Sequence, residues 1–321
     1  MQATGACQKR ALRFAADTGA MVGCAESHPA PVPVATPGAN LKIEVRRLVT
    51  GEETSVLNFL NRRPLRNIAL IGFIHDHGLE SERNRGTFYG CFRNGWLIGV
   101  ALIGHFVVLS GTEETVPIFA EVARLWHEPE IRLVLGDQEA TEIFHRMLHQ
   151  SSCALRVQGK ESHLLYALTE AADDSVEIKG LRRARPDEAD EVAQAHARAY
   201  YEQLGIDPLV QDPDGFRQRV LTRIEMGRVW IVRDDEGIAF KADVSFDTGE
   251  AVYLEGLWTR PELRGVGWGT QVTKTLCRRL LLVYPVVCLF ANTSDQRAKA
   301  FYHRLGFQSL APYHLIRYAK N

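Results

Sequence analysis

Residues 252–270 read Val-Tyr-Leu-Glu-Gly-Leu-Trp-Thr-Arg-Pro-Glu-Leu-Arg-Gly-Val-Gly-Trp-Gly-Thr, an apolar run followed by a glycine-rich end. The apolar run predicts a strand, and Pro261 indicates a turn after it. From Thr270 onward apolar residues recur at helical spacing until Pro285, which ends the predicted helix. The stretch therefore predicts a strand, a glycine loop and a helix in succession.

The glycine loop has the chemistry of an anion site. Glycine at positions 265, 267 and 269 permits positive φ angles and lets a ligand approach the backbone closely. Backbone N–H groups at a helix N-terminus converge on one point, where the helix dipole also favours negative charge. Arg264 adds a positive charge at the rim. The loop predicts a phosphate or pyrophosphate ligand.

Three phosphate-binding patterns compete for this loop. A P-loop places a lysine before its Ser or Thr, but here Gly269 is followed directly by Thr270. A dinucleotide fingerprint needs G-x-G-x-x-G and an acidic residue about 20 positions further on, and residues 286–291 contain no acid. The third pattern, Arg/Gln-x-x-Gly-x-Gly/Ala, fits Arg264 to Gly269. It is the coenzyme A pyrophosphate loop of the GNAT superfamily of N-acetyltransferases, which this segment resembles.

The resemblance continues to the C-terminal part of the chain. A strand pattern at residues 286–292 precedes a helical pattern that stops at Gly306-Phe307. GNAT proteins commonly end with Asn-x-x-Ala-x-x-x-Tyr-x-x-x-Gly-Phe, which Ala298, Tyr302 and Gly306-Phe307 match. Asp295 stands where the family has asparagine, so Asn292 at the strand end becomes a candidate for the cofactor amide contact. The resemblance covers residues 176–318, about one domain length.

The resemblance implies a mixed α/β GNAT fold and acetyl transfer from acetyl-CoA to a primary amine of a small molecule or peptide. It implies that the backbone of Leu257, Trp258 and Thr259 lines the pantetheine arm, with one N–H facing the thioester oxygen. The residues implied to hold the rest of the cofactor are Arg264, Gly265, Val266, Gly267, Trp268, Gly269, Thr270, Asn292 and Asp295.

Two side chains are candidates for proton transfer. Glu255 lies inside an apolar strand, where a carboxylate needs a partner; it is either the general base for the amine or one side of a structural ion pair. By resemblance, Tyr302 protonates the departing thiolate. Its helical spacing is equally typical of a core aromatic.

The chain also repeats itself. Residues 41–48 and 176–184 both read as a strand before an acidic helix start, and their Arg-Arg pairs lie 136 positions apart. Two hairpin patterns follow, at residues 87–104 and 229–246, and Phe-His-Arg-Met-Leu at 144–148 corresponds to Phe-Tyr-His-Arg-Leu at 301–305. Three matches in one order predict two copies of one fold.

The first copy lacks the glycine loop. Its equivalent segment, residues 109–116, has one glycine and two glutamates, whose negative charges repel a pyrophosphate. We therefore expect a disordered leader with a Pro-rich linker at residues 1–40, a degenerate GNAT-like domain at 41–171 and a catalytic GNAT domain at 176–321. A faint likeness of the leader to a lipoprotein signal is interrupted by Arg13 and Asp17.

Composition agrees with two ordinary globular domains. The 321 residues are 45% hydrophobic and 24% charged, with a formal net charge of −1. The charge gives no reason to expect a nucleic-acid partner, and no apolar run is long enough for a membrane span. Six scattered cysteines without a C-x-x-C pair indicate free thiols in a reducing compartment, so we expect a cytoplasmic protein.

Several other residues have two interpretations. His75-Asp76-His77 and the pair His145 and His149 lack further ligands at suitable spacing, so no metal is expected. Aromatic residues that either line an acceptor pocket or pack in the core are Tyr200, Tyr201 and Trp230, and His196 lies on the surface or in the core.

Two other functions stay open. A non-catalytic acyl-CoA sensor would bind the cofactor without turnover, and Asp295 would reflect its relaxed chemistry. A peptidyl-transfer enzyme that uses aminoacyl-tRNA would need a basic groove and no pyrophosphate loop.

Overall fold

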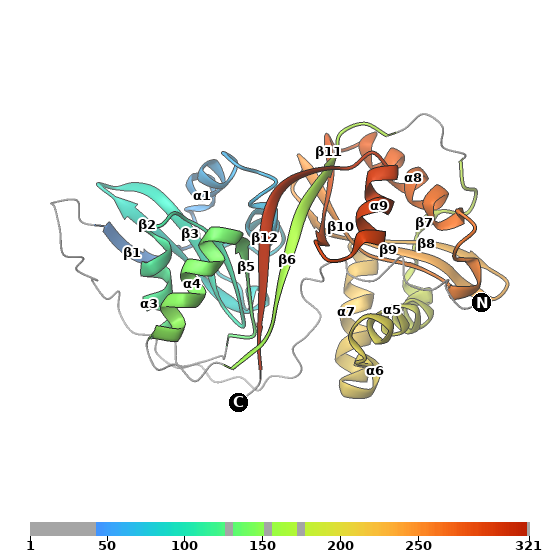
Figure 1. Cartoon of the computed structure of the whole chain (residues 1–321), viewed down its shortest axis with the longest axis horizontal. Helices are drawn as coiled ribbons and strands as arrows, with labels where there is room; N and C mark the ends of the chain where they lie inside the picture. The colour runs from blue at the N-terminus through green and yellow to red at the C-terminus, as the bar shows by residue number, and fades with distance from the viewer. Residues whose placement is uncertain (1–42, 126–130, 151–155, 172–176, 320–321) are drawn as a thin grey trace. The chain divides into compact units, whose positions relative to one another are not determined.

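The computed structural model describes residues 43–125, 131–150, 156–171 and 177–319, which fall into two compact units (Figure 1). The C-terminal unit spans Leu164–Leu310, and the N-terminal unit contains residues 43–163 and 311–319. The predicted leader and three of the six cysteines, Cys7, Cys24 and Cys153, lie outside the described residues.

The N-terminal unit is a sheet in the order β1-β2-β3-β4-β5-β12, followed by the first half of β6. Asn94 and Gly95 both have positive φ and form the tight turn between β2 and β3 that the sequence predicts. Helices α3 and α4 pack their apolar residues on this sheet. The elements are β1 (Ile43–Arg47), α1 (Glu53–Leu60), α2 (Ile68–His77), η1 (Glu82–Asn84), β2 (Gly86–Arg93), β3 (Trp96–Gly104), β4 (Phe106–Ser110), α3 (Val116–Arg124), β5 (Leu133–Asp137), α4 (Gln138–Gln150), β6 (Val157–Leu168) and β12 (Gln308–Tyr318).

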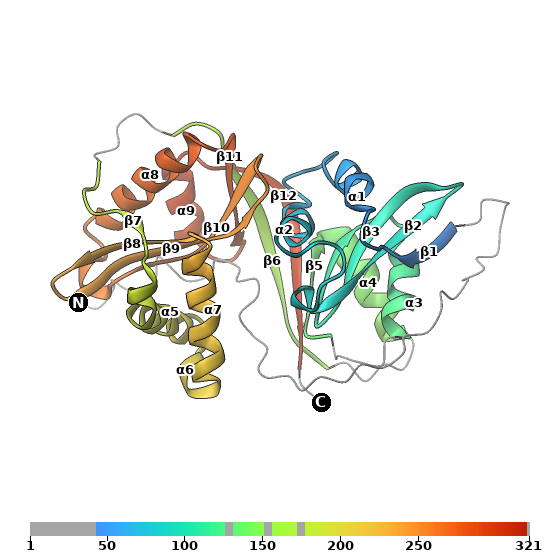
Figure 2. The same cartoon turned by 180° about the vertical axis from the view of Figure 1, so that it is seen from behind.

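The strands of the C-terminal unit have the order β6-β11-β10-β9-β8-β7, with parallel and antiparallel pairs. Helices α8 and α9 cover one face and α5 to α7 the other, each over its own apolar cluster (Figure 2). Its elements are β7 (Arg182–Arg183), η2 (Pro186–Glu188), α5 (Ala189–Leu204), α6 (Pro208–Gln211), α7 (Pro213–Glu225), β8 (Val229–Asp234), β9 (Gly237–Asp247), β10 (Ala251–Thr259), η3 (Pro261–Leu263), α8 (Trp268–Leu281), β11 (Val286–Asn292) and α9 (Gln296–Arg304).

Each unit contains a strand segment from the other half of the sequence. The second half of β6 lies beside β11 in the C-terminal unit, whereas β12 pairs with β5 in the N-terminal unit. The β12 pairing is antiparallel, from Tyr313 opposite Asp137 to Arg317 opposite Leu133. The bounds of the compact units therefore differ from the predicted domains 41–171 and 176–321. The division at residues 171–175 stays a prediction that rests on the sequence repeat.

The repeated Arg-Arg pairs make the same contacts in both copies. Arg46 makes a bidentate ion pair with Glu52, and Arg182 does the same with Glu188, again 136 positions further on. The predicted strand over 176–184 is wrong, because only Arg182–Arg183 is extended and paired. Gly180 just before it has a φ of +92°, which ends an extended segment.

Candidate active site

The site begins where β10 parts from β11. These two parallel strands pair from Ala251 opposite Val286 to Tyr253 opposite Cys288. Strand β10 then runs on to Thr259 and β11 to Asn292 beyond the residues in register. The edge of β10 that carries Leu257 thus lies beyond the residues in register with β11, at a gap between strands of one sheet. A backbone edge of this kind can hydrogen bond an extended ligand.

A bulge distorts β10 at the same place. Its register with β9 shifts between Glu255 and Trp258, and Gly256 there has a φ of +60°. A Cβ atom on Gly256 would lie 2.7 Å from Asp243 Oδ2. The bulge therefore requires glycine, both for its backbone angle and for the side chains packed against it.

The glycine loop follows β10 as predicted. Gly265 and Gly267 both have positive φ, +84° and +83°, and Gly267 is the N-cap residue of α8 without a side-chain cap. A Cβ atom on Gly269 would lie 2.7 Å from Thr259 Oγ1, so glycine lets the start of α8 pack on the end of β10. No side chain of the N-cap residue covers the first N–H groups of α8, which leaves them suited to an anion.

Arg264 fixes the loop and does not offer a free charge at its rim. Its Nε donates to the Thr259 carbonyl at 2.7 Å, and its Nη2 lies 2.9 Å from Glu202 on α5. Glu202 thus neutralises the guanidinium, which corrects the expectation of a positive rim. Val266, at the outer turn of the loop, is exposed.

Asn292 and Asp295 shape the turn between β11 and α9. The Asn292 Oδ1 atom accepts hydrogen bonds from the Ser294 backbone N–H and hydroxyl, at 2.8 and 2.7 Å. Asp295 is the N-cap of α9, and its Oδ1 accepts from the N–H groups of Arg297 and Ala298. Aspartate and asparagine are equally good N-caps, so the departure from the family pattern keeps the helix start intact.

Glu255 lies in a buried ionic network on the face covered by α5 and α7. The Ser245 hydroxyl donates to Glu255, and Arg223 Nη1 on α7 lies 3.5 Å from Glu255 Oε1. The network also holds Asp243, which is directly opposite Glu255 in the register and bonded to the buried Lys241. Both carboxylates are only 1% exposed. Glu255 therefore has the partners that a structural ion pair requires.

The rest of this network was not predicted from the sequence. Strand β9 has polar side chains at every second position, Lys241, Asp243 and Ser245, so these side chains share one face. This alternation within an otherwise apolar strand is the sequence pattern that could have predicted the network. Burial acts to lower the pKa of Arg223, but the Glu255 and Asp243 carboxylates raise it overall. His196 on α5 is buried, with its Nδ1 4.0 Å from Asp243 Oδ2.

Tyr302 lies in the core on the other face of the sheet. It is buried among apolar residues, with its ring 5.7 Å from that of Phe307 and 6.0 Å from that of Tyr166. Both Tyr302 and Glu255 act electrostatically on Tyr253, whose pKa is raised well above its usual range, mainly by burial. Tyr253 thus lies within electrostatic range of both proposed catalytic groups.

The equivalent loop of the N-terminal unit is built differently. Five residues, 111–115, join β4 to α3, and the φ angle of Gly111 is not positive. The Thr112 N–H donates to the Thr115 hydroxyl, and a Cβ on Gly111 would lie 2.6 Å from that oxygen. A threonine side chain thus uses a loop N–H that an anion would need, which adds to the repulsion expected from Glu113 and Glu114.

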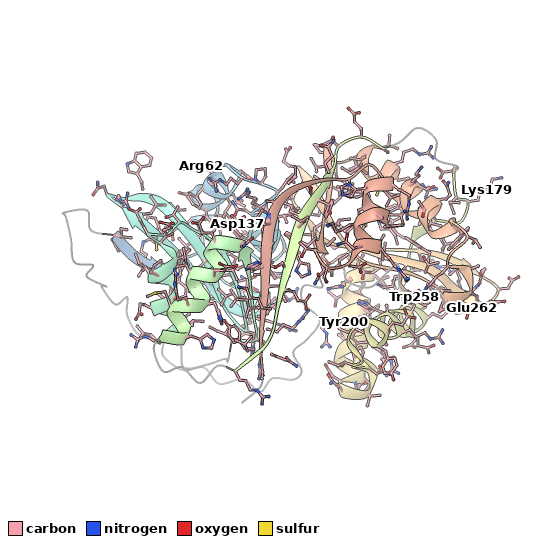
Figure 3. All side chains as sticks on the ribbon, in the orientation of Figure 1. Arg62, Asp137, Lys179, Tyr200, Trp258 and Glu262 are labelled. Atoms are coloured by element: carbon pink, nitrogen blue, oxygen red, sulfur yellow. The ribbon has the colours of Figure 1, made fainter. Side chains whose placement is uncertain are left out.

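A pocket of about 620 Å³ opens on the α5 side of the C-terminal unit. Tyr201 contributes its exposed ring. Tyr200, which is labelled in Figure 3, is buried against His196 and Phe216 and belongs to the core. Trp230 lies outside this pocket lining and stacks with Arg183. The lining residues are Gln194, Ala197, Arg198, Tyr201, Glu202, Asp207, Leu209, Glu236, Trp258, Arg260, Pro261 and Glu262.

The described ranges contain neither a metal-binding cluster nor a membrane-spanning helix. Within them, no group of three or more His, Cys, Asp or Glu side chains is placed to hold a metal ion. His145 instead pairs with the Tyr318 hydroxyl at 2.8 Å. In the part of the chain that the structure describes, no helix has the length and apolar character to cross a membrane.

Comparison with known proteins finds one family match, which lies inside the C-terminal unit. Residues 225–309 match the model of the acetyltransferase (GNAT) domain family. A search of the curated proteins finds no match to this sequence.

Solved structures resemble both units together. A Drosophila protein has a TM-score of 0.61 at 12% identity, over 86% of this chain and 98% of its own. A tandem GNAT protein from the clavulanic acid biosynthesis pathway has a TM-score of 0.55 at 13% identity, over 87% and 99%. A GNAT-family acetyltransferase from Colwellia psychrerythraea has a TM-score of 0.53 at 13% identity, over 86% and 100%. Residues 225–309 therefore match a GNAT acetyltransferase domain, in a chain that has the mixed α/β fold of tandem GNAT proteins.

Proposed function

We propose that this chain is an N-acetyltransferase that moves the acetyl group of acetyl-CoA to a primary amine of a small molecule or peptide by direct attack in a ternary complex. The observation that carries the proposal is the uncapped start of α8 beside the point where β10 leaves β11. These two features supply an anion site and a strand edge, and acetyl-CoA combines a pyrophosphate with an extended, amide-containing arm.

The residues of the C-terminal unit fit this cofactor. The backbone of Leu257, Trp258 and Thr259 would bind the pantetheine arm along the gap beside β10. The N–H groups of residues 265–270 would hold the pyrophosphate, with Arg264 keeping the loop in place. Asn292 and Asp295, at the end of β11 and the start of α9, would complete the cofactor site through the turn that they form.

The proposed reaction needs two proton transfers. The amine nitrogen forms its bond to the thioester carbon as the carbon–sulfur bond breaks; the ammonium proton goes to a base, and the thiolate takes up a proton. Glu255 is the proposed base and Tyr302 the proposed acid. Their burial supports the assignment, because a base or acid acts most strongly where water is excluded.

The N-terminal unit is proposed to be a degenerate copy without a cofactor site, since Thr115 and the two glutamates replace the glycine loop. The proposed location is the cytoplasm. Among the described residues, Cys91, Cys277 and Cys288 are free, buried thiols, as expected in a reducing compartment.

A non-catalytic acyl-CoA sensor is the second candidate. It is favoured by the engagement of Glu255 with Ser245 and Arg223 and by the packing of Tyr302 in the core. It predicts saturable binding of acetyl-CoA without transfer to any amine.

The loop assignment is tested by Gly267→Glu. A carboxylate at the start of α8 should repel the pyrophosphate and lower acetyl-CoA affinity at least about tenfold, which is ~1.4 kcal/mol. Gly249→Glu is the matched control, because Gly249 also has positive φ and open space around it but lies in the β9–β10 turn. Calorimetric titration of both folded variants with acetyl-CoA decides the matter. Equal affinity in the two variants overturns the assignment.

A further inference from the structure

The pocket beside α5 has an excess of negative charge. Arg260 lies among three carboxylates: Asp234 at 2.9 Å, Glu236 at 3.1 Å and Glu262 at 3.8 Å. Both Glu236 and Glu262 line the pocket and are largely exposed, at 75% and 70% of their side chains. One guanidinium cannot neutralise three carboxylates, so two negative charges are left at this side of the opening.

The remaining charges do not change the balance. Glu202 is neutralised by Arg264, and Arg198 offsets Asp207, which also caps α6 with its Oδ1 atom. With Asp234 and Arg264 included, five carboxylates face three guanidiniums around the pocket.

A second, independent feature points to a ligand. Trp258 lines the pocket and is only 2% exposed, and within the described residues its indole Nε1 has no hydrogen-bond partner. A buried N–H without an acceptor costs about 1–3 kcal/mol, which a ligand oxygen in the pocket would recover. Tyr201 adds an exposed aromatic ring at the same opening, on which an ammonium group can stack.

The charge makes this pocket unsuitable for the cofactor. Coenzyme A carries phosphates, which the surplus carboxylates repel, whereas the start of α8 attracts them. Adjacent residues of β10 point to opposite faces of the sheet. Leu257 packs in the apolar cluster under α8 and α9, and Trp258 packs in the cluster under α5 and α7. The pocket therefore approaches the same strand from the face opposite α8.

We propose that this pocket binds the acceptor, and that the acceptor is a small amine with at least two ammonium groups and a hydroxyl or carbonyl oxygen, the chemistry of polyamino sugars. The proposal rests on the proposed function for the transfer step alone. One ammonium group is held by Glu236 and Glu262, the oxygen accepts from the Trp258 indole, and a second amine is left to lose its proton and attack. The volume of about 620 Å³ is typical of small-molecule sites.

Three probes separate the two recognition elements. Kanamycin has several ammonium groups and many oxygens, spermidine has the charges without oxygen, and glucosamine has oxygens with a single ammonium group. Calorimetry on the full chain without acetyl-CoA should give kanamycin at least about tenfold higher affinity than either of the others. Equal binding of glucosamine overturns the charge argument, and equal binding of spermidine overturns the assignment of the Trp258 N–H.

Two variants test the residues. Glu236→Gln with Glu262→Gln should lower kanamycin affinity at least about tenfold and leave acetyl-CoA affinity unchanged. The matched control neutralises two exposed glutamates elsewhere in the unit, Glu225→Gln with Glu250→Gln, and should change neither affinity. Trp258→Phe keeps an aromatic ring, although a smaller one, and removes the indole N–H, so kanamycin affinity should fall about tenfold while spermidine affinity stays the same.

Because these affinities are measured without turnover, they are independent of the transfer reaction. Loss of acetyl-CoA binding or of transfer with kanamycin binding intact counts against the proposed function alone. Absence of kanamycin binding in a chain that binds acetyl-CoA, or equal losses in the test and control double variants, overturns the pocket assignment.

Discussion

Glu255 and Asp243 are neighbours across two strands, equally buried, and both within 4 Å of Arg223, but only Glu255 lies on β10, the strand that borders the proposed cofactor site. This near symmetry at the scale of single residues offers a way to separate a chemical role from a structural one. If Glu255 only balances the charge of Arg223, neutralising Glu255 and neutralising Asp243 should lower activity to the same extent.

Glu255→Gln is predicted to lower kcat about 100-fold or more and to remove the limb of the pH–rate profile that reports the base. It should also lower the free energy of unfolding by about 3–5 kcal/mol, because Arg223 loses a buried partner. Asp243→Asn is the matched control, with a similar loss of stability but a much smaller loss of kcat. Initial rates and urea unfolding of both variants measure this. Equal losses of kcat would identify Glu255 as a structural ion pair.

At the scale of elements, the Arg182 and Glu188 pair fastens the entrance of α5 to strand β7. The Glu188 carboxylate accepts two hydrogen bonds from Arg182 and one from the Arg185 N–H at 2.8 Å. These bonds, mainly those from Arg182, lower the pKa of Glu188 to about 2. Helix α5 supplies one wall of the acidic pocket, so this pair also sets where that wall begins.

The Glu188 pKa gives the sign of a pH dependence. The pKa of Glu188 in the folded protein, about 2, is below the ordinary glutamate value of 4.5, so its contribution to stability is complete above pH 4.5 and is lost as the pH falls toward 2. Glu188→Gln should remove about 1–3 kcal/mol of stability at neutral pH and flatten this acid limb. Glu52→Gln, the same change in the other copy, should have the smaller effect because Glu52 is 26% exposed against 6% for Glu188. Urea unfolding between pH 2 and 6 tests this, and a larger effect at Glu52 would contradict it.

The sequence predicted the elements of the site better than its side-chain contacts. The strand, the glycine loop and the helix at residues 251–281 follow from local spacing, because backbone angles and helical periodicity are local properties. The pairing of Arg264 with Glu202 and the network around Glu255 join residues from distant elements, which spacing does not reveal. The catalytic roles of Glu255 and Tyr302 stay predictions.

At the scale of the whole molecule, strand β12 makes the N-terminal unit depend on the C-terminal part of the sequence. Leu315 and Ile316 of β12 are buried in that unit, and Ile316 belongs to the cluster formed with α3 and α4. The repeat predicted two copies of one fold, and the tandem GNAT fold confirms it. The exchange of strands could not be predicted, because both β5 and β11 read as ordinary buried strands and local pattern does not specify the neighbour.

Ile316→Ala should destabilise the N-terminal unit by about 2–5 kcal/mol through the lost methyl groups and the cavity that they leave. Leu310→Ala removes similar apolar bulk from the same strand at a half-exposed position and should cost less than about 1 kcal/mol. Hydrogen exchange read strand by strand should show reduced protection of β5 in Ile316→Ala, with β10 unchanged. A uniform loss over both units would contradict the assignment of β12.

The exchange of β12 also has a consequence for synthesis on the ribosome. Tyr313 pairs with Asp137, so 176 residues must be translated after β5 before its partner exists. At about 5–20 residues per second this delay is on the order of ten seconds or more. During that time the nascent N-terminal unit carries an unpaired β5 edge, the kind of edge that chaperones and other chains bind. The unit made first is thus completed late, after the C-terminal unit, Leu164–Leu310, has been translated.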